Sequence, residues 1–523
     1  MTGVMNRYTA ERFNPFGEAD CESEVKLLKQ DYSRYFFYHT RFNNLALDPK
    51  VFLIVGRRGS GKTALSQFFS FQRSMSGTNE NGAIAIDVDE PAAFEKVLEE
   101  ITLKASHSRE IAIPRIAKLW HLVVWSVIFS ELKDTDPRIR AACIFGSREG
   151  QLSSFIRHCL KVLLERLTQN EDDLLDELES IFADGRIRTG MEAVLEAAQR
   201  RPVIVAFDTL ENYAIHDPVM MQAIAALIQC GSQFNRDFAH LGVHIKIFVM
   251  AEVFPHLKEE IILNPLKSVR NEVHMHWRPK DLMRLISWRF YNYLQAMELL
   301  APESRDIDWD SPTDVLEKMW YPYFGRTLRN EHNLPERTFP YVLRHTQMRP
   351  RQLIVLCNAI AASAMAQGTF PHFHPSTIVN AINNRQNSLA EEVINSYSSV
   401  YPRVGRIVEA LTNLPMLFQG NLLDKRAPMT ASEWVRSEYS PHSFRQLVSE
   451  LGIVGRVRHL NRAAGYAEAD FEYSTESRLP LLSENMCAIH PMFYRKLTVG
   501  YEDRVRVYPF PDHEDFKTWR MAP

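Results

Sequence analysis

The residues best suited to chemistry form one run near the amino-terminal end of the chain. In the run 56–64, the glycines let the backbone N–H groups curl around phosphate oxygens, and Lys62 can reach the β- and γ-phosphates. The threonine hydroxyl is a ligand for Mg²⁺. We therefore expect a loop that binds ATP with Mg²⁺, with Lys62 in the catalytic role and Thr63 on the metal. The run has the spacing Gly-x4-Gly-Lys-Thr: Gly56, Arg57, Arg58, Gly59, Ser60, Gly61, Lys62, Thr63 and then Ala64.

Magnesium at such a loop also needs a carboxylate at the end of a neighbouring buried strand. Asp208 follows the apolar run 202–207, which gives it that place. Glu211 lies three residues further on, where an acid can orient or deprotonate the attacking water. Two structural interpretations stay open. Asp208 would also serve as a helix N-cap, and Glu211 as a solvent-facing acid in a first helical turn.

The elements that must position these residues can be read from the apolar pattern. The apolar run 51–55 leads into the loop, and apolar residues recur at helical spacing directly after it. Strands alternating with helices predict an α/β fold, a P-loop NTPase core with a mostly parallel sheet covered on both faces. The long interval between Lys62 and Asp208 predicts a large helical insertion at about 91–200. The further runs with strand character are 83–88, 202–207, 245–250 and 273–277.

The rest of the chain divides into four further regions. The amino-terminal region carries a predicted helix from Cys21 to about Phe42. The region after the core is helical, with a polar interruption near 302–337, and the region after that has helices followed by a hairpin. The predicted domains are an N-terminal helical extension (1–48), the P-loop ATPase core (49–278), a helical lid (279–398), a small winged-helix-like α+β domain (399–500) and a C-terminal tail (501–523).

Composition excludes several classes of protein. The net charge of −3, from 61 basic and 64 acidic residues, excludes a strongly basic nucleic-acid coat. The six cysteines are scattered without a Cys-x-x-Cys pair, which favours a reducing compartment. No run of eighteen apolar residues occurs. We therefore expect a cytoplasmic protein with no membrane partner.

Asp208-Thr209-Leu210-Glu211, following an apolar strand, resembles the Walker B motif of STAND, KAP-like and AAA+-related P-loop ATPases. One bacterial, defence-associated branch of these ATPases is similar over most of 16–365 and more weakly over 400–497. The resemblance implies a nucleotide-driven switch that forms a homo-oligomer and regulates an effector protein encoded separately, in prokaryotic anti-phage defence. The stretches that carry it, besides the phosphate loop, are 16–20, 119–125, 276–282, 348–354 and 489–493.

The resemblance also assigns roles to arginines. Arg349 and Arg351 match the lid arginine that reads the γ-phosphate, and spacing does not separate the two. A surface salt bridge at a helix start is the alternative. Arg270 would act in trans as an arginine finger, although an ordinary surface arginine is the simpler interpretation. Glu252 departs from the family, which has a polar or basic residue there. Because an ionised carboxylate cannot donate a hydrogen bond, this departure argues against fast hydrolysis but not against binding.

Two other functions stay open. The first is a DNA-binding AAA+-like ATPase for replication, repair or transposition, which would use the winged-helix-like domain to contact nucleic acid. The second is a scaffold that holds nucleotide without hydrolysing it. Nearby acids almost balance the arginines of the C-terminal domain, so the sequence does not show whether they form a basic face. These arginines are Arg403, Arg406, Arg436, Arg445, Arg456, Arg458 and Arg462.

Overall fold

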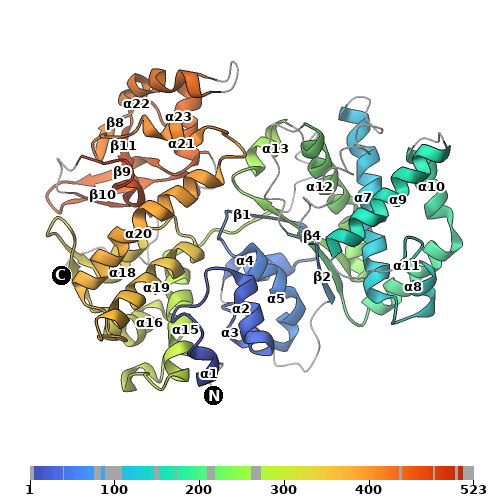
Figure 1. Cartoon of the computed structure of the whole chain (residues 1–523), viewed down its shortest axis with the longest axis horizontal. Helices are drawn as coiled ribbons and strands as arrows, with labels where there is room; N and C mark the ends of the chain where they lie inside the picture. The colour runs from blue at the N-terminus through green and yellow to red at the C-terminus, as the bar shows by residue number, and fades with distance from the viewer. Residues whose placement is uncertain are drawn as a thin grey trace. The chain divides into compact units, whose positions relative to one another are not determined.

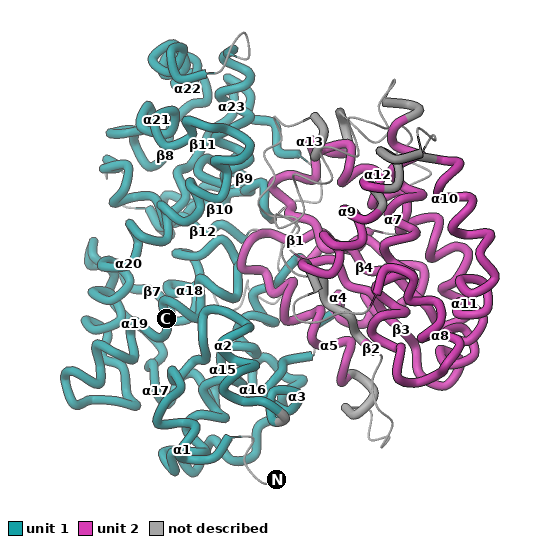
Figure 2. The backbone as a smooth tube through the Cα atoms, turned by 45° about the vertical axis from the view of Figure 1, so that its right-hand side comes forward, with its two compact units in different colours: residues 1–40, 276–523 teal, residues 41–275 magenta. Residues whose placement is uncertain are grey.

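The chain forms two compact units, shown in two colours in Figure 2. The core unit is Arg41–Met275. The split unit combines Met1–Thr40 with His276–Pro523, so the first forty residues belong with the C-terminal half of the chain. The structure, a computed structural model, describes residues 5–38, 40–75, 84–88, 109–146, 152–170, 174–208, 218–260, 272–434, 439–474, 478–500 and 505–510.

A five-stranded sheet is the centre of the core unit, and its order is β2-β3-β4-β1-β5. Every neighbouring pair in this sheet is parallel. The predicted α/β class and parallel sheet are therefore confirmed. All five predicted strands are present, although the fifth ends at His274 and not at Trp277. The strands are β1 (Leu53–Gly56), β2 (Ile84–Val88), β3 (Val203–Phe207), β4 (Val243–Met250) and β5 (Glu272–His274).

Helices cover both faces of this sheet. Phe69 of α5 (Lys62–Met75) lies against Phe248 of β4, with 6.3 Å between the ring centroids. Gly231 of α12 (Pro218–Phe238) lies against Ile247 of the same strand. Because successive strand residues point to opposite faces, α5 and α12 cover opposite faces. This explains why β1, β3 and β4 are buried along their whole length, and why β1 and β3 read as continuous apolar runs.

The described parts of the stretch between β2 and β3 are mostly helical, and Figure 1 shows their helices grouped on one side of the sheet. Trp120 and Trp125 of α7 are 3% and 0% exposed, so both lie in the core. The segment Ala112–Leu132 of α7 is long and apolar enough to cross a membrane, but 72% of its most apolar window is buried, as in the core helix of a globular protein. The helices are α7 (Arg109–Leu132), α8 (Pro137–Ala141), α9 (Leu152–Asn170), α10 (Leu174–Ala183) and α11 (Gly185–Ala198).

The prediction of one helix from Cys21 to Phe42 is wrong. Lys29 has a φ of 48°, and Phe36 is extended, so the helix is interrupted twice. The pieces are α2 (Cys21–Leu28), η1 (Lys29–Asp31), α3 (Tyr32–Tyr35) and α4 (Arg41–Leu47), with α1 (Arg7–Ala10) before them.

The amino-terminal segment packs against two helices of the split unit. Phe16 stacks on Phe290 of α15 with 4.4 Å between the ring centroids. The side chain of Asn358 in α19 accepts a hydrogen bond from the Phe16 N–H and donates one to the Gly17 carbonyl. Buried Glu24 forms a two-pronged ion pair with Arg289 of α15. These contacts hold the chain's first residues to the split unit.

The region between α15 and α18 has more structure than the predicted polar interruption at 302–337. It contains a turn of π-helix, η5 (Leu316–Trp320), and a small antiparallel hairpin of β6 and β7. The helices of this region are α15 (Pro279–Ala296), η4 (Pro302–Ser304), α16 (Pro312–Val315), α17 (Tyr321–Phe324), α18 (Thr338–Leu343), α19 (Pro350–Ala366) and α20 (Pro375–Ser396); the strands are β6 (Thr327–Arg329) and β7 (Pro335–Arg337).

The C-terminal part of the split unit is built on a second sheet, of order β12-β10-β9-β11-β8. The hairpin predicted to follow helices in this region is present as β9 and β10, directly after α23. The sheet is larger than that hairpin, because β11 pairs with β9 on its other side. The elements are α21 (Val404–Glu409), β8 (Leu417–Gln419), α22 (Asn421–Arg426), α23 (Pro441–Glu450), β9 (Val454–Asn461), β10 (Tyr466–Asp470), β11 (Met486–Ile489) and β12 (Arg506–Tyr508).

Candidate nucleotide-binding site

The predicted phosphate loop joins the carboxyl end of β1 to the first turn of α5. Gly59 and Gly61 have φ values of 78° and 97°, a left-handed backbone that glycine adopts without steric cost. Lys62 is the first residue of α5. Thr63 and Ala64 follow it in the first turn and are half-buried. The helix therefore directs its N-terminal N–H groups and its partial positive charge towards the loop.

Gly56, the last residue of β1, has no room for a side chain. An added Cβ would lie 2.5 Å from Ser60 Oγ, 3.0 Å from Met275 Sδ and 3.1 Å from Lys62 Cγ. Ser60 Oγ itself lies 3.8 Å from Met275 Sδ. The loop is thus closed tightly over Gly56, as a backbone cradle for phosphate oxygens requires.

Lys62 is buried within this cradle. Only 5% of it is exposed, and its ammonium donates to the carbonyl oxygens of Gly56 at 3.3 Å and Arg57 at 3.5 Å. Arg57 is half-buried and Arg58 is exposed. The loop therefore holds one buried cation on its inner side, which suits a polyphosphate ligand.

Asp208 lies at the same edge of the sheet as the loop. It directly follows β3 and is 2% exposed. Parallel strands bring their carboxyl ends to one edge, and β4 separates β3 from β1. Strands in a sheet are about 4.8 Å apart, so β3 lies about 10 Å from β1 across the sheet. Along β4, Phe207 is paired with Ile247 and Gly56 with Met250, so β1 extends further than β3 at this edge. An oxygen ligand of this kind and in this place fits Mg²⁺.

Glu252 is a further buried acid at this edge that the sequence flagged only as a departure from a family pattern. It is the second residue after β4 and is 3% exposed. Its Oε1 accepts a hydrogen bond from the backbone N–H of Arg58 at 3.3 Å. Met275, which follows β5, also contacts the loop through Ser60, and nothing in its residue type signals that contact.

Two of the predicted site residues are not placed. Glu211 and Arg270 both lie outside the described residues. Their proposed roles as the catalytic acid and as an arginine finger therefore remain predictions.

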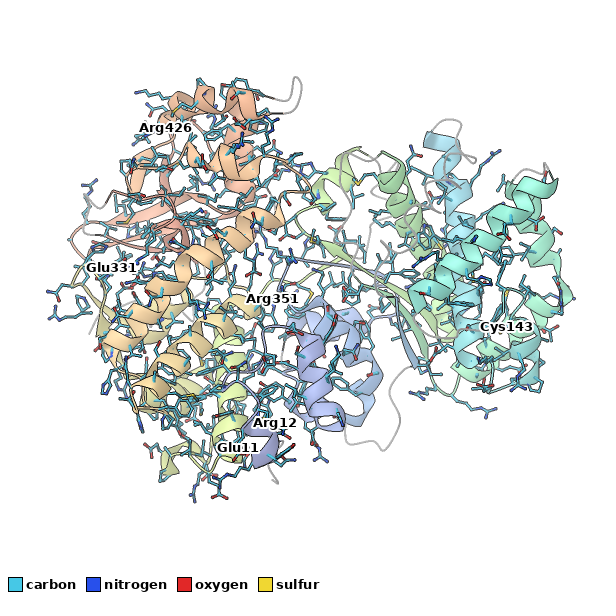
Figure 3. The ribbon with its side chains drawn as sticks, in the orientation of Figure 1. Glu11, Arg12, Cys143, Glu331, Arg351 and Arg426 are labelled. Atoms are coloured by element: carbon cyan, nitrogen blue, oxygen red, sulfur yellow. The ribbon has the colours of Figure 1, made fainter. Side chains whose placement is uncertain are left out.

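The two predicted lid arginines differ in their surroundings within the split unit. Arg349 is 3% exposed and donates to the Gln347 side chain at 2.8 Å. Arg351, labelled in Figure 3, donates to the Ala19 carbonyl at 3.0 Å. It also lies 3.8 Å from Glu392, with 32% of its side chain exposed. The surface salt bridge considered for this helix start is thus present for Arg351.

The core unit contains a second buried lysine, which lies away from the loop. Lys246 of β4 is 0% exposed, and its ammonium donates to the carbonyls of Asp48 at 2.8 Å and Val51 at 2.5 Å, just before β1 begins. Burial lowers the pKa of Lys246 to about 7. Because the amino end of β1 is opposite the phosphate loop, we interpret Lys246 as structural.

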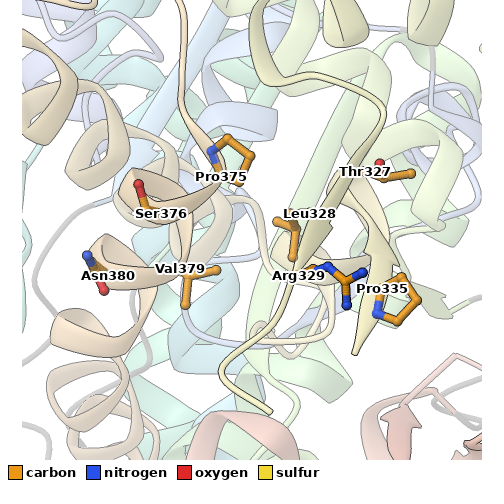
Figure 4. Close-up of a pocket in the computed structure, with 8 residues that line it drawn as sticks. All are labelled: Thr327, Leu328, Arg329, Pro335, Pro375, Ser376, Val379 and Asn380. Atoms are coloured by element: carbon orange, nitrogen blue, oxygen red, sulfur yellow. The ribbon is translucent and has the colours of Figure 1, made fainter. Parts of the chain in front are cut away.

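A separate hollow of about 730 Å³ lies in the split unit, between the β6–β7 hairpin and the start of α20 (Figure 4). Its one charged side chain, Arg329, donates to the Asn333 carbonyl at 3.0 Å. Thr327 and Ser376 supply hydroxyl groups, but no acid or histidine that could activate them is among its lining residues. These residues are Thr327, Leu328, Arg329, Pro335, Pro375, Ser376, Val379 and Asn380. In the described parts of the chain, no three His, Cys, Asp or Glu residues are grouped to hold a metal ion.

Comparisons with known proteins give weak relationships. No protein-family model matches the chain. A curated protein of Escherichia coli K12, described as a putative transposon gamma-delta 80.3 kDa protein, is 22% identical over 419 residues. The match covers 77% of this chain and 54% of that protein, so the chain spans about half the length of the curated relative.

One solved structure aligns over most of the chain. It is the Aeropyrum pernix ORC2 protein in ADPNP and ADP complexes, with 12% identity and coverage of 93% of this chain and 94% of that one. Its TM-score of 0.35 is too low to support an inference about this chain. The evidence for function is therefore the geometry of the Gly56–Ala64 loop and of the residues beside it.

Proposed function

We propose that this chain is an ATPase that binds ATP with Mg²⁺ in the Gly56–Ala64 loop and hydrolyses it. The observation that carries this proposal is the closed loop itself. An added Cβ at Gly56 would be 2.5 Å from Ser60 Oγ, and buried Lys62 lies inside the turn. The loop starts at the carboxyl end of a strand in a parallel sheet, the edge where such sheets bind ligands.

The residues at this edge have different roles in binding and hydrolysis of ATP. Lys62 neutralises charge on the β- and γ-phosphates, and the N–H groups at the start of α5 bind phosphate oxygens. Thr63 and Asp208 would hold Mg²⁺, which supplies further positive charge against the phosphates. Glu211 would orient the attacking water and accept its proton.

The finer parts of the proposal rest on the sequence resemblance. They are homo-oligomerisation, a lid at 279–398 with Arg349 or Arg351 reading the γ-phosphate, Arg270 acting in trans, and regulation of a separately encoded effector in anti-phage defence. A ligand that binds one conformation better than another shifts the population towards it, which is how ATP would act as the switch signal.

A DNA-linked ATPase is the second candidate, and the description of the curated relative as a transposon protein favours it. The order of α23, β9 and β10 also supports a winged-helix-like domain. However, Arg445 of α23 is 3.2 Å from Asp424, and both Arg456 and Arg458 are within 4 Å of Asp470. These ion pairs weaken the positive field that such a domain needs for DNA. Retention of the full chain on duplex DNA that ATP strengthens and salt weakens would support this candidate.

The central test is nucleotide binding by the Lys62→Ala variant. We expect wild-type protein to bind a fluorescent ATP analogue in the presence of Mg²⁺, and Lys62→Ala to lose affinity by at least about tenfold, since a charge-assisted contact is removed. Lys118→Ala is the matched control, because this lysine is exposed and its partner Glu179 is exposed too. Unchanged affinity in Lys62→Ala, with both variants folded, would contradict the assignment.

A Glu211→Gln variant separates hydrolysis from binding. If Glu211 accepts the proton, this variant binds ATP normally but turns it over at least about a hundredfold more slowly. Gel filtration with light scattering, with and without ATP and Mg²⁺, then shows whether the trapped state assembles. Wild-type protein that carries nucleotide without turnover, and a Glu211→Gln variant that behaves identically, would instead indicate the non-hydrolysing scaffold.

A further inference from the structure

Glu252 lies directly beside the phosphate loop. Strand β4 pairs with β1 up to Met250 opposite Gly56, and the next N–H, that of Ala251, donates to the Gly56 carbonyl at 3.2 Å. Glu252 follows at once. Its Oε1 accepts the Arg58 N–H at 3.3 Å, and only 3% of the residue is exposed. The end of β4 thus places a buried carboxylate against the Arg57–Arg58 turn, which we call the outer turn of the loop.

This arrangement has two opposing physical effects. The hydrogen bond from the Arg58 N–H to a carboxylate is charge-assisted, and it holds the outer turn in one conformation. The same negative charge raises the free energy of any anion placed nearby, and burial increases the effect because the local dielectric constant is low. A neutral acceptor at this position would supply the first effect without the second.

We propose that Glu252 is a positioning residue of the phosphate loop and also limits how tightly the loop holds nucleotide. It braces the Arg57–Arg58 turn through the Arg58 N–H, and its charge opposes the phosphate anion that the rest of the loop attracts. The effect is faster release of nucleotide than the loop alone would give. This inference rests on the proposed function, since it concerns the same phosphate site.

Two substitutions at Glu252 separate the effect of its hydrogen bond with the Arg58 N–H from the effect of its negative charge. Glu252→Gln keeps an oxygen that accepts from the Arg58 N–H but carries no charge, whereas Glu252→Leu removes both. We expect Glu252→Gln to bind Mg²⁺–ATP about five- to tenfold more tightly than wild type, with correspondingly slower dissociation. Glu252→Leu should bind more weakly than Glu252→Gln, because its outer turn has lost the brace. Stopped-flow release of a fluorescent ATP analogue measures both quantities.

Glu179→Gln is the matched control, because it removes one negative charge from the same unit at a side chain that is 70% exposed. Binding by Glu252→Gln that is no tighter than wild type, or an equal gain in Glu179→Gln, would overturn the inference. Equal affinities of Glu252→Gln and Glu252→Leu would remove the bracing role. Unfolding temperatures of all three variants confirm that the folded protein is being compared.

Failure of the inference can be told from failure of the proposed function. If wild type binds ATP and Lys62→Ala does not, an unchanged Glu252→Gln overturns only the role of Glu252. If neither wild type nor Glu252→Gln binds nucleotide, the proposed function fails and this inference fails with it.

Discussion

The ammonium group of Lys62 lies 3.3 Å from the carbonyl oxygen of Gly56, the last residue of β1. The same oxygen accepts the N–H of Ala251, which follows β4, at 3.2 Å. One backbone carbonyl therefore joins the first residue of α5 and the end of β4 to the start of the phosphate loop. The conformation of the loop depends on the position of Gly56.

Gly56→Ala should disable the loop without unfolding the protein. The new Cβ would be 2.5 Å from Ser60 Oγ, so the loop has to shift. Overpacking of this kind costs about 1–3 kcal/mol, and we expect a loss of ATP affinity of at least about tenfold. Gly185→Ala is the control, because this residue begins α11 and an added Cβ meets nothing within 4 Å. Titration with a fluorescent ATP analogue checks the prediction, and equal affinities of the two variants would count against it.

Arg351→Ala and Arg349→Ala should have different effects on stability. Arg349 is buried and bonds to Gln347, which in turn donates to the Leu451 carbonyl at 2.8 Å. Losing that network should cost about 1–3 kcal/mol of unfolding free energy. Arg351 makes a half-exposed ion pair, which contributes less than about 1 kcal/mol.

Turnover measurements on the same two variants then test the γ-phosphate role. We expect Arg351→Ala to lower the rate of ATP hydrolysis by at least about tenfold while the protein stays as stable as wild type, as removal of a phosphate-reading arginine does. Lys is not an equivalent replacement for a planar guanidinium, so Arg351→Lys should recover little. A wild-type hydrolysis rate in Arg351→Ala would exclude this arginine from the reaction.

Because of Lys246, the free energy of unfolding of the core unit should rise as the pH increases from about 7 to 10. Burial lowers the pKa of Lys246 from its ordinary value of 10.5 to about 7. Between these two values the unfolded chain binds the proton and the folded chain does not, so stability rises with pH in this window and levels off above it. Below pH 7 both states are protonated and the dependence ends.

Lys246→Met isolates this contribution, because it removes the titrating group from the buried position. Urea unfolding of wild type and Lys246→Met at pH 7, 8.5 and 10 should give a stability difference that widens in favour of wild type as the pH rises. A difference that stays constant over this range would show that the lysine keeps its ordinary pKa in the folded protein.

Arg344 and Glu336 form the ion pair on which the split unit should depend most. Their side chains are 4% and 0% exposed, with Arg344 Nη2 3.0 Å from Glu336 Oε1. Glu336 also accepts from Asn330 at 2.6 Å and from Tyr508 at 3.1 Å. Arg344→Met leaves a buried, uncompensated carboxylate, so we expect a loss of about 3–5 kcal/mol.

The pair is best measured by a double-mutant cycle. Because Arg344→Met and Glu336→Leu together remove both charges, the double variant should lose less stability than the sum of the single variants. Additive losses in chemical unfolding would mean that the two side chains do not interact. The exposed pair of Arg326 and Glu317 provides the comparison, since its removal should change stability by less than about 1 kcal/mol.

The core sheet was predictable because its three central strands, β1, β3 and β4, are buried on both faces. Runs such as Val203–Phe207 contain only apolar residues, and the phosphate loop fixes which strand comes first. The place of Asp208 at the same edge follows from parallel strands alone. The prediction of a single helix from Cys21 to about Phe42 was wrong for a different reason. Nothing in the type of Lys29 indicates a φ of 48°.

Two features could not be predicted from the sequence: the buried position of Glu252 and the full extent of the C-terminal sheet. A Glu after a strand does not reveal that its carboxylate is buried, because the contact with Arg58 joins residues 194 positions apart. In the C-terminal sheet, β8 and β12 have three residues each and pair with distant strands. Segments this short have too few positions to show an alternating pattern.

The division of the chain into a core unit and a split unit has a consequence for biosynthesis. Phe16 and Gly17 leave the ribosome early, but their partners on α15 and α19 are made only after the whole of Arg41–Met275. The nascent chain can therefore complete the core unit while the segment before Arg41 is still unpacked. Docking of the amino-terminal segment becomes a late, long-range folding event, with the slow kinetics expected for contacts between residues far apart in sequence.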